Sequence, residues 1–172
     1  MKLIGLVTTA ILIPFTGMAA APSETESARK FVQGFYDWYT PHALSHKSGA
    51  AWDLGHTSKK SAFAPSLLSA LNEDLKASKK VKDEIVGLDF DPFLSSQDPV
   101  SHYSVTKVEK RGQAYLASIN GMTGSKPSAK EDVIARVEKV KGTWRFTNFM
   151  YPSGENLLGV LAKLKKDRAP HK

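Results

Sequence analysis

Three aspartates gather around a proline-containing turn in the middle of the chain. Asp89 and Asp91 precede Pro92, and Asp98 follows Gln97. Three carboxylates could bind a hard cation such as Ca²⁺, but the sequence lacks the alternating oxygen ligands and the closing Glu of an EF-hand loop. One carboxyl could instead act as a general base if an apolar pocket raised its pKa. The favoured interpretation is structural, with Asp91 capping the turn before Pro92 and Asp98 capping the residues that follow it.

A second group that could do chemistry consists of histidines. His42 and His46 stand four residues apart, and Asp53 and His56 follow shortly after. On a helix that spacing places both imidazoles on one face, where they can bind zinc, but the Glu of a zinc protease is missing between them. The surrounding stretch is rich in Ser, Gly and Lys, so we expect solvated histidines, no metal site and no cofactor.

Nucleophile and phosphate-binding motifs are missing from the sequence. The serine–histidine neighbours at 45–46 and 101–102 lack a G-x-S-x-G elbow, and Gly121 and Gly124 lack the Lys-Ser/Thr ending of a P-loop. No catalytic residue is therefore assigned. Tyrosine and tryptophan can present a polar tip to a pocket, although core packing is the favoured role for the aromatic residues. The candidate ligand-binding residues are Tyr36, Tyr39, Asp91, Gln97 and Asp98.

The composition narrows the class of protein. The 172 residues include no cysteine, which excludes disulfides, thiolate metal sites and the lipid-modified cysteine of an anchored lipoprotein. The net charge of +7 is spread along the chain. It favours acidic partners and anionic surfaces, with contact to a membrane or envelope more plausible than DNA binding, but a merely solvated surface is the favoured interpretation. We expect no nucleic-acid partner and no membrane anchor.

The N-terminus has the pattern of a secretory signal peptide. One positive residue, Lys2, is followed by an apolar run to Phe15 and by the small residues Ala19-Ala20-Ala21. We therefore assign 1–21 to a signal peptide and 22–172 to a single exported domain, periplasmic or secreted. The mature chain is expected to begin within about two residues of Pro22. Intact-mass measurement of the exported protein tests this, and retention of Met1 would contradict it.

Helix signals dominate the first half of the remaining chain. Apolar residues recur every three or four positions after Ser23, which predicts an amphipathic helix that ends near Thr40, because Pro41 disfavours helical geometry before it. The polar stretch 42–64 is expected to be mostly loop. Pro65 opens a second helix with a lysine-rich last turn, and a third helix follows Ser153.

Strand signals follow Pro99. Alternating apolar and polar residues predict one hairpin that pairs 103–109 with 113–119 and another that pairs 133–139 with 143–151. In the last strand, Trp144, Phe146 and Met150 are expected on one face, with Trp144 and Phe146 in the core. Helices followed by strands indicate the α+β class, with helices packed on one face of an antiparallel sheet and a C-terminal helix.

Three short motifs carry a resemblance to a known family. They are Phe35-Tyr36-x-Trp38-Tyr39, Asp89-x-Asp91-Pro92-Phe93 and Gln97-Asp98, followed by a strand meander that ends in Trp144-x-Phe146. Over roughly Ala28 to Leu164 the chain resembles a family of exported bacterial proteins in the nuclear-transport-factor-two-like, or cystatin-like, superfamily. The resemblance implies a curved sheet wrapped around a long helix, forming a cone with a pocket at its open end.

The resemblance leaves two functions open. The superfamily includes isomerases, dehydratases, ligand carriers, transport adaptors and immunity proteins, so the fold alone does not determine the activity. The leading hypothesis is an exported, non-enzymatic binding domain for a small ligand or a protein partner, of which an immunity protein is one type. The alternative is a small isomerase, dehydratase or hydrolase with Asp91 or Asp98 as its base. Many relatives dimerise through the sheet, and a homodimer is left open here.

Overall fold

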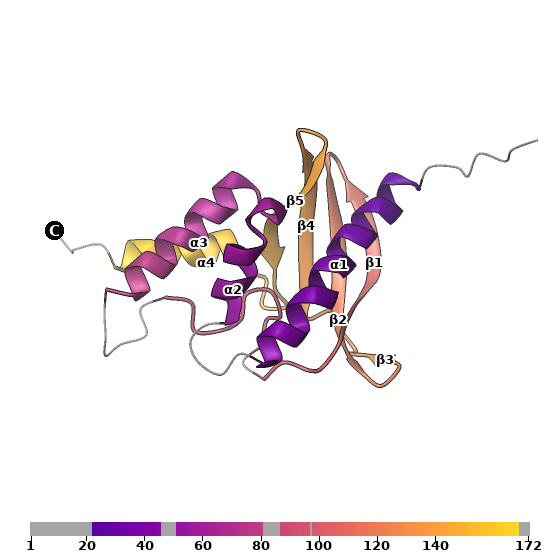
Figure 1. Ribbon diagram of the computed structural model, residues 1–172, viewed down its shortest axis with the longest axis horizontal. Coiled ribbons are helices and arrows are strands. Elements are labelled where there is room, and N and C mark those ends of the chain that lie inside the picture. The colour runs from indigo at the N-terminus through magenta and orange to yellow at the C-terminus, as the bar shows by residue number, and fades with distance from the viewer. Residues whose placement is uncertain (1–21, 46–50, 81–86, 97, 169–172) are drawn as a thin grey trace, which may run out of the picture.

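An antiparallel sheet forms the centre of the protein (Figure 1). The computed structural model describes residues 22–45, 51–80, 87–96 and 98–168. The long strands pair in the order β1-β2-β4-β5, and a short strand, β3, pairs with β2. Both predicted hairpins are confirmed. The strands are β1 (Tyr103–Arg111), β2 (Ala114–Thr123), β3 (Lys126–Pro127), β4 (Val133–Val140) and β5 (Thr143–Met150).

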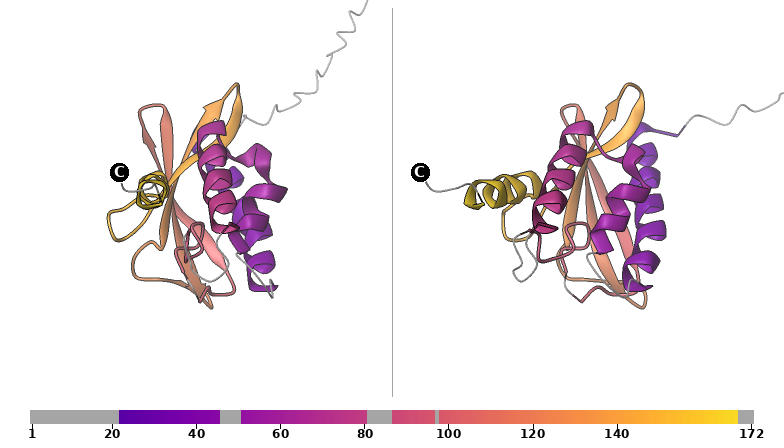
Figure 2. Two further views of the ribbon diagram at one scale, coloured as in Figure 1. Left: turned by 90° about the vertical axis from the view of Figure 1, so that its left-hand side faces the viewer. Right: turned by 60° about the vertical axis from the view of Figure 1, so that its left-hand side comes forward.

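The sheet bends because each of its outer long strands carries a bulge. In β1 the register with β2 shifts between Val105 and Lys107, and in β5 an extra residue, Thr147, has no partner on β4. A bulge bends its strand and increases the local twist. Two bulges on opposite sides of the sheet therefore give it the concave face against which the helices pack (Figure 2).

The helices occupy mainly the concave side of the sheet (Figure 2). The longest, α1, lies against β1 and β2, while α3 and α4 pack together beside β5. This arrangement confirms the α+β class. Within the described residues, no helix is long and apolar enough to cross a membrane. The helices are α1 (Glu24–Ser45), α2 (Ala51–Ser58), the 3₁₀ turn η1 (Lys60–Ala62), α3 (Pro65–Ser78) and α4 (Leu157–Asp167).

Two sequence predictions about the helices are wrong. Helix α1 continues through Pro41 to Ser45 instead of ending near Thr40. Proline removes one backbone hydrogen bond, and here it does so about one turn before the helix ends, where His42 Nδ1 lies 2.6 Å from the Trp38 carbonyl oxygen. The described part of 42–64 is largely helical, because α2 packs the side chain of Trp52 into the core.

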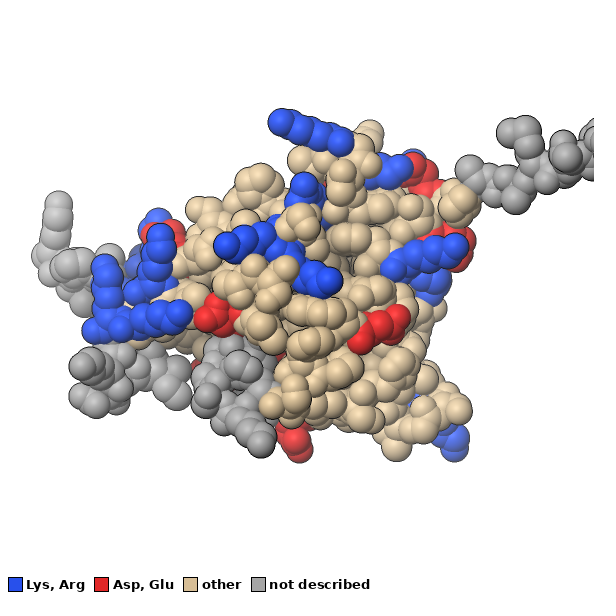
Figure 3. Space-filling model, in the orientation of Figure 1, with Lys and Arg blue, Asp and Glu red and all other residues tan. Residues whose placement is uncertain are grey.

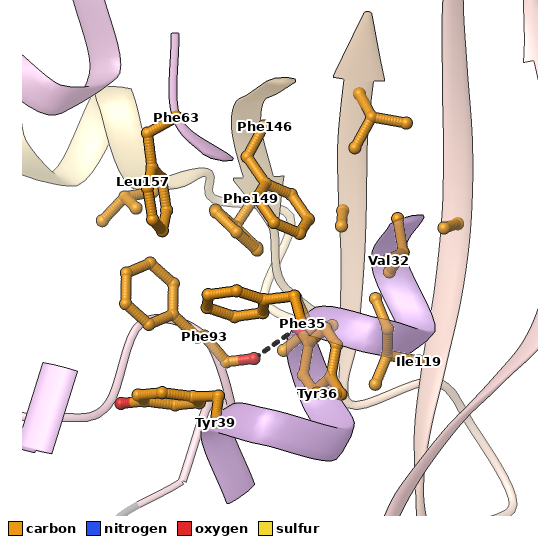
Figure 4. Close-up of a cluster of buried hydrophobic side chains, with 14 of the residues drawn as sticks. Val32, Phe35, Tyr36, Tyr39, Phe63, Phe93, Ile119, Phe146, Phe149 and Leu157 are labelled. Atoms are coloured by element: carbon orange, nitrogen blue, oxygen red, sulfur yellow. Dashed lines mark hydrogen bonds between the residues drawn. The ribbon is translucent and has the colours of Figure 1, made fainter. Parts of the chain in front are cut away.

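Aromatic side chains fill the space between the helices and the concave face of the sheet (Figure 4). The Phe35 ring centroid lies 4.9 Å from that of Phe146 and 5.6 Å from that of Phe93. Phe146 is fully buried and Trp144 is 8% exposed, which confirms both as core residues. Met150 is only partly buried, and Phe149 takes the expected core position because the bulge at Thr147 moves the alternation by one residue.

Candidate functional site

The carboxylate of Asp91 lies at the centre of the residues that the sequence singled out. Its Oδ1 accepts hydrogen bonds from the backbone N–H of Phe93 (2.9 Å) and of Leu94 (3.1 Å). Its Oδ2 accepts a hydrogen bond of 2.5 Å from the Tyr39 hydroxyl on α1. The capping role predicted for Asp91 is therefore confirmed. The tyrosine contact adds a tie between the turn and α1.

Burial changes the acidity of this pair. Removal of Asp91 from water raises the pKa of its carboxyl to about 6, although the hydrogen bonds from Tyr39, Phe93 and Leu94 act in the opposite direction. Burial and the neighbouring Asp91 charge raise the pKa of Tyr39 well above its ordinary value. Tyr39 consequently stays protonated and donates its proton in the hydrogen bond. A carboxyl with a pKa near 6 is the kind of group that a general base requires.

Two further tyrosines hold the same turn. The Tyr36 hydroxyl, also on α1, donates to the Phe93 carbonyl oxygen at 2.6 Å (Figure 4). The Tyr151 hydroxyl, just after β5, donates to the Pro92 carbonyl oxygen at 3.1 Å. Since the turn carries Phe93 into the aromatic core, these contacts fix a segment that has no regular secondary structure of its own.

The structure brings Tyr36, Tyr39 and Asp91 together but separates Asp98 from them. Asp98 is exposed, and its backbone N–H donates to Ser96 Oγ at 3.0 Å. Gln97 lies outside the described residues.

The histidine segment shows no metal-binding geometry within the part of the chain that the structure describes. His56 is fully buried instead of solvated, because its ring lies against Trp52 and its Nε2 lies 3.2 Å from Asn72 Oδ1 on α3. His42 lies on α1, and His46 falls outside the described residues. The contact between His56 and Asn72 joins α2 to α3.

A serine–histidine contact that the sequence did not indicate lies at the start of β1, between Ser104 on the strand and His102 just before it. Ser104 Oγ is 3.2 Å from His102 Nε2; His102 is exposed and Ser104 is half-buried. A hydrolytic pair needs a third group that orients the imidazole. Among the described residues, no acidic side chain hydrogen-bonds to His102 to serve as that third group.

The interior around Asp91 is filled by protein side chains. The rings of Phe35, Phe93 and Phe146 occupy the volume between α1 and the sheet and are each at most 5% exposed. Gly55 of α2 leaves no spare room either, because a Cβ there would lie 2.8 Å from ring carbons of both Tyr39 and Phe93. The three hydrogen bonds to Asp91 therefore come from a packed region of the protein.

A groove of about 920 Å³ lies on the outside of the protein, along α3 and beside the end of α4. The residues that line it follow one another at intervals of three or four positions, so a single face of α3 supplies nearly the whole wall. The character of the wall changes along the helix, from apolar, through polar residues that include the acidic Glu73, to a mainly cationic end. In chain order the wall residues are Pro65, Leu68, Ser69, Asn72, Glu73, Lys76, Ala77, Lys80 and Arg168.

Lysines and arginines gather at the cationic end of this groove. Figure 3 shows their side chains at the left of the molecule, where α3 and α4 end. Sequence reasoning assigned the lysines after Leu75 to the negative end of the helix dipole and did not identify the groove. The available signal was the recurrence of polar and cationic residues on the face of α3 opposite Leu67 and Leu71.

Comparison with known proteins adds one structural likeness. No protein-family model matches the chain, and no curated protein matches it. A crystal structure described as a protein of unknown function from Bacteroides thetaiotaomicron superposes with a TM-score of 0.50. The similarity covers 73% of this chain and 90% of that chain at 19% sequence identity. At this identity the two proteins share a fold, and the likeness says nothing about activity.

Proposed function

We propose that the protein is an exported, non-enzymatic binding domain that holds a protein partner on its outer surface, in the groove along α3. The observation that carries the proposal is the contrast between a filled interior and an open groove. Phe35, Phe93 and Phe146 occupy the interior where a superfamily member would hold a small ligand, whereas the α3 groove offers about 920 Å³. The resemblance to exported members of the nuclear-transport-factor-two-like superfamily supports an extracytoplasmic setting.

The shape of the groove suits a polypeptide better than a small molecule. It is open along one helix, and its polar wall residues are spread over the four turns of α3 instead of converging on a point. Small-molecule sites are usually enclosed and have a few polar groups aimed inward. A helix face with an adjoining groove is a common docking surface for peptides and protein segments.

One observation favours an enzyme as the second candidate. Asp91 has a pKa near 6 and a tyrosine partner, which are features of a general base. Against this role, both of its carboxylate oxygens already accept hydrogen bonds from the protein. These hydrogen bonds use part of the acceptor capacity of the carboxylate for structure.

Site-specific photo-crosslinking in the native host tests the leading proposal. A benzophenone amino acid is placed at position 69, in the wall of the groove, and at position 126 in β3 as the control. Both natural residues, Ser69 and Lys126, are polar. We expect a discrete crosslinked protein from position 69 alone. The same adducts at both positions, or none from position 69, would contradict the proposal.

A further inference from the structure

We infer that the segment of the partner that enters the groove is acidic and carries one apolar anchor residue. The anchor lies against Pro65 and Leu68, and the carboxylates lie against Lys76 and Lys80. This inference rests on the proposed function, because it assigns the chemistry of the partner at the same groove.

The order of residues along α3 gives the binding surface a direction. The apolar end begins at Pro65, and the cationic end reaches Lys80, fifteen residues later, or about 22 Å at helical rise. Between them, the polar side chains of Ser69, Asn72 and Glu73 line the same wall, and the Glu73 carboxylate is paired with Lys165 of α4. A bound segment of about seven extended residues would span this length. Its apolar residue and its carboxylates must therefore lie at opposite ends.

The charge balance of α3 and α4 identifies the sign of the partner. Residues 65–80 and 157–168 contain seven lysines and arginines but only three acids, an excess of four positive charges out of the +7 of the whole chain. Two of those acids are already paired, Glu73 with Lys165 and Asp74 with Arg168. No described acidic side chain forms an ion pair with Lys76 or Lys80, and both residues are exposed in the wall of the groove.

Two ion pairs and a hydrogen bond tie α3 to α4 and to Leu88 beside the groove. The Asp74 carboxylate is 1% exposed, and its Oδ1 lies 2.6 Å from Arg168 Nη1 at the end of α4. Its Oδ2 accepts a hydrogen bond from the Leu88 backbone N–H at 3.1 Å. The ion pair between Lys165 and Glu73 adds a second link between α3 and α4. A surface that is already ordered loses less conformational entropy on binding, which favours recognition of a short segment.

The residues of the groove wall also favour a polypeptide over other anionic partners. Single-stranded nucleic acid is usually bound by a basic surface with aromatic rings for base stacking, and the described wall of this groove contains none. A lipid surface would contact the outermost lysines and leave the polar middle of a concave wall unused. An acidic polypeptide can use the apolar, polar and cationic parts together.

Fluorescence anisotropy of three labelled twelve-residue peptides tests the inference on the full mature chain. The first peptide has a leucine near one end and glutamates over its other half. The second replaces the leucine with serine, and the third replaces the glutamates with glutamines. We expect binding of the first peptide with a dissociation constant on the order of 100 μM, weakened about threefold by loss of the leucine and about tenfold by loss of the glutamates.

A matched pair of charge-reversal variants locates the binding site. Lys76→Glu with Lys80→Glu is expected to weaken the first peptide about tenfold, whereas Lys30→Glu with Lys126→Glu, which changes the net charge equally on α1 and β3, is expected to change it less than twofold. Thermal melts check that both variants are folded. Equal losses in the two variants would show diffuse attraction and overturn the inference.

Three other outcomes decide against the inference. Equal binding of the leucine and serine peptides would show that the groove does not recognise an apolar anchor residue. Tighter binding of phosphatidylglycerol vesicles or of a thymidine oligonucleotide than of the first peptide assigns the groove to another class of partner. Failure of the acidic peptide while position 69 still crosslinks to a protein overturns the acidic chemistry and leaves the proposed function standing. Failure of the crosslink itself contradicts the proposed function.

Discussion

Replacement of Phe146 by alanine is expected to lower the free energy of unfolding by about 4 kcal/mol. Its ring is fully buried, and its centroid lies 4.9 Å from those of Phe31 and Phe35 and 5.1 Å from that of Phe149. Truncation would remove this apolar contact and leave a cavity that neighbouring rings, fixed by α1 and by the sheet, cannot fill. Urea unfolding followed by tryptophan fluorescence measures the loss.

The next residues of β5 provide the matched controls. Because Thr147 is bulged, Phe149 points into the core and Met150 does not. Phe149→Ala should therefore be destabilised about as much as Phe146→Ala, and Met150→Ala by about 1 kcal/mol. A larger loss for Met150→Ala than for Phe149→Ala would contradict the bulge. Trp144→Ala should lower the free energy of unfolding by about 3 kcal/mol, which is the lower end of the range for a buried aromatic residue. The smaller loss is expected because Trp144 lies near the end of the hairpin.

The parts of the fold that local sequence patterns determine were predictable. The two hairpins could be predicted because glycines at 112 and 142 take positive φ angles at their turns, and strand alternation surrounds each turn. The helix α3 could be predicted from Pro65 and the leucines after it. In both cases, the residues that determine the element lie within a few positions of one another.

Features that depend on distant contacts were not predictable in the same way. The helix α2 has only eight residues, and the burial of His56 on it depends on a contact with Asn72 of α3. The bulge at Thr147 adds a residue that a plain alternation of polar and apolar positions does not reveal. In each case, the stabilising partner lies on another element of the fold.

The candidate site shows the same division. The capping role of Asp91 was predictable, since Pro92 follows it directly. Its hydrogen bond to Tyr39 spans 52 residues of sequence and becomes visible only in the fold. The α3 groove was missed because lysines at a helix end have an adequate local explanation. Asp98 was included because of its neighbour in sequence, which does not determine whether a side chain faces the interior.

The pH dependence of stability should change when Asp91 is replaced by asparagine. At pH 7 the substitution is expected to lower the free energy of unfolding by about 1 kcal/mol or less, because the amide oxygen still accepts hydrogen bonds from Phe93 and Leu94. The carboxyl has a pKa of about 6 in the folded protein and 3.8 when exposed. The folded state therefore takes up a proton between pH 7 and pH 4.5, while the unfolded chain remains largely ionised.

Because only the folded state takes up this proton, the natural protein becomes more stable relative to Asp91→Asn as the pH falls. The difference in the free energy of unfolding between the two proteins should widen by about 2 kcal/mol from pH 7 to pH 4.5. Urea unfolding at both pH values measures this difference, and groups common to the two proteins cancel. Asp98→Asn is the control, because Asp98 is exposed and its substitution should give the same small difference at both pH values. A constant difference for Asp91→Asn would show that burial does not raise the pKa of Asp91. Loss of partner crosslinking in Asp98→Asn at unchanged stability would move the functional centre from the α3 groove to the turn that contains Asp98.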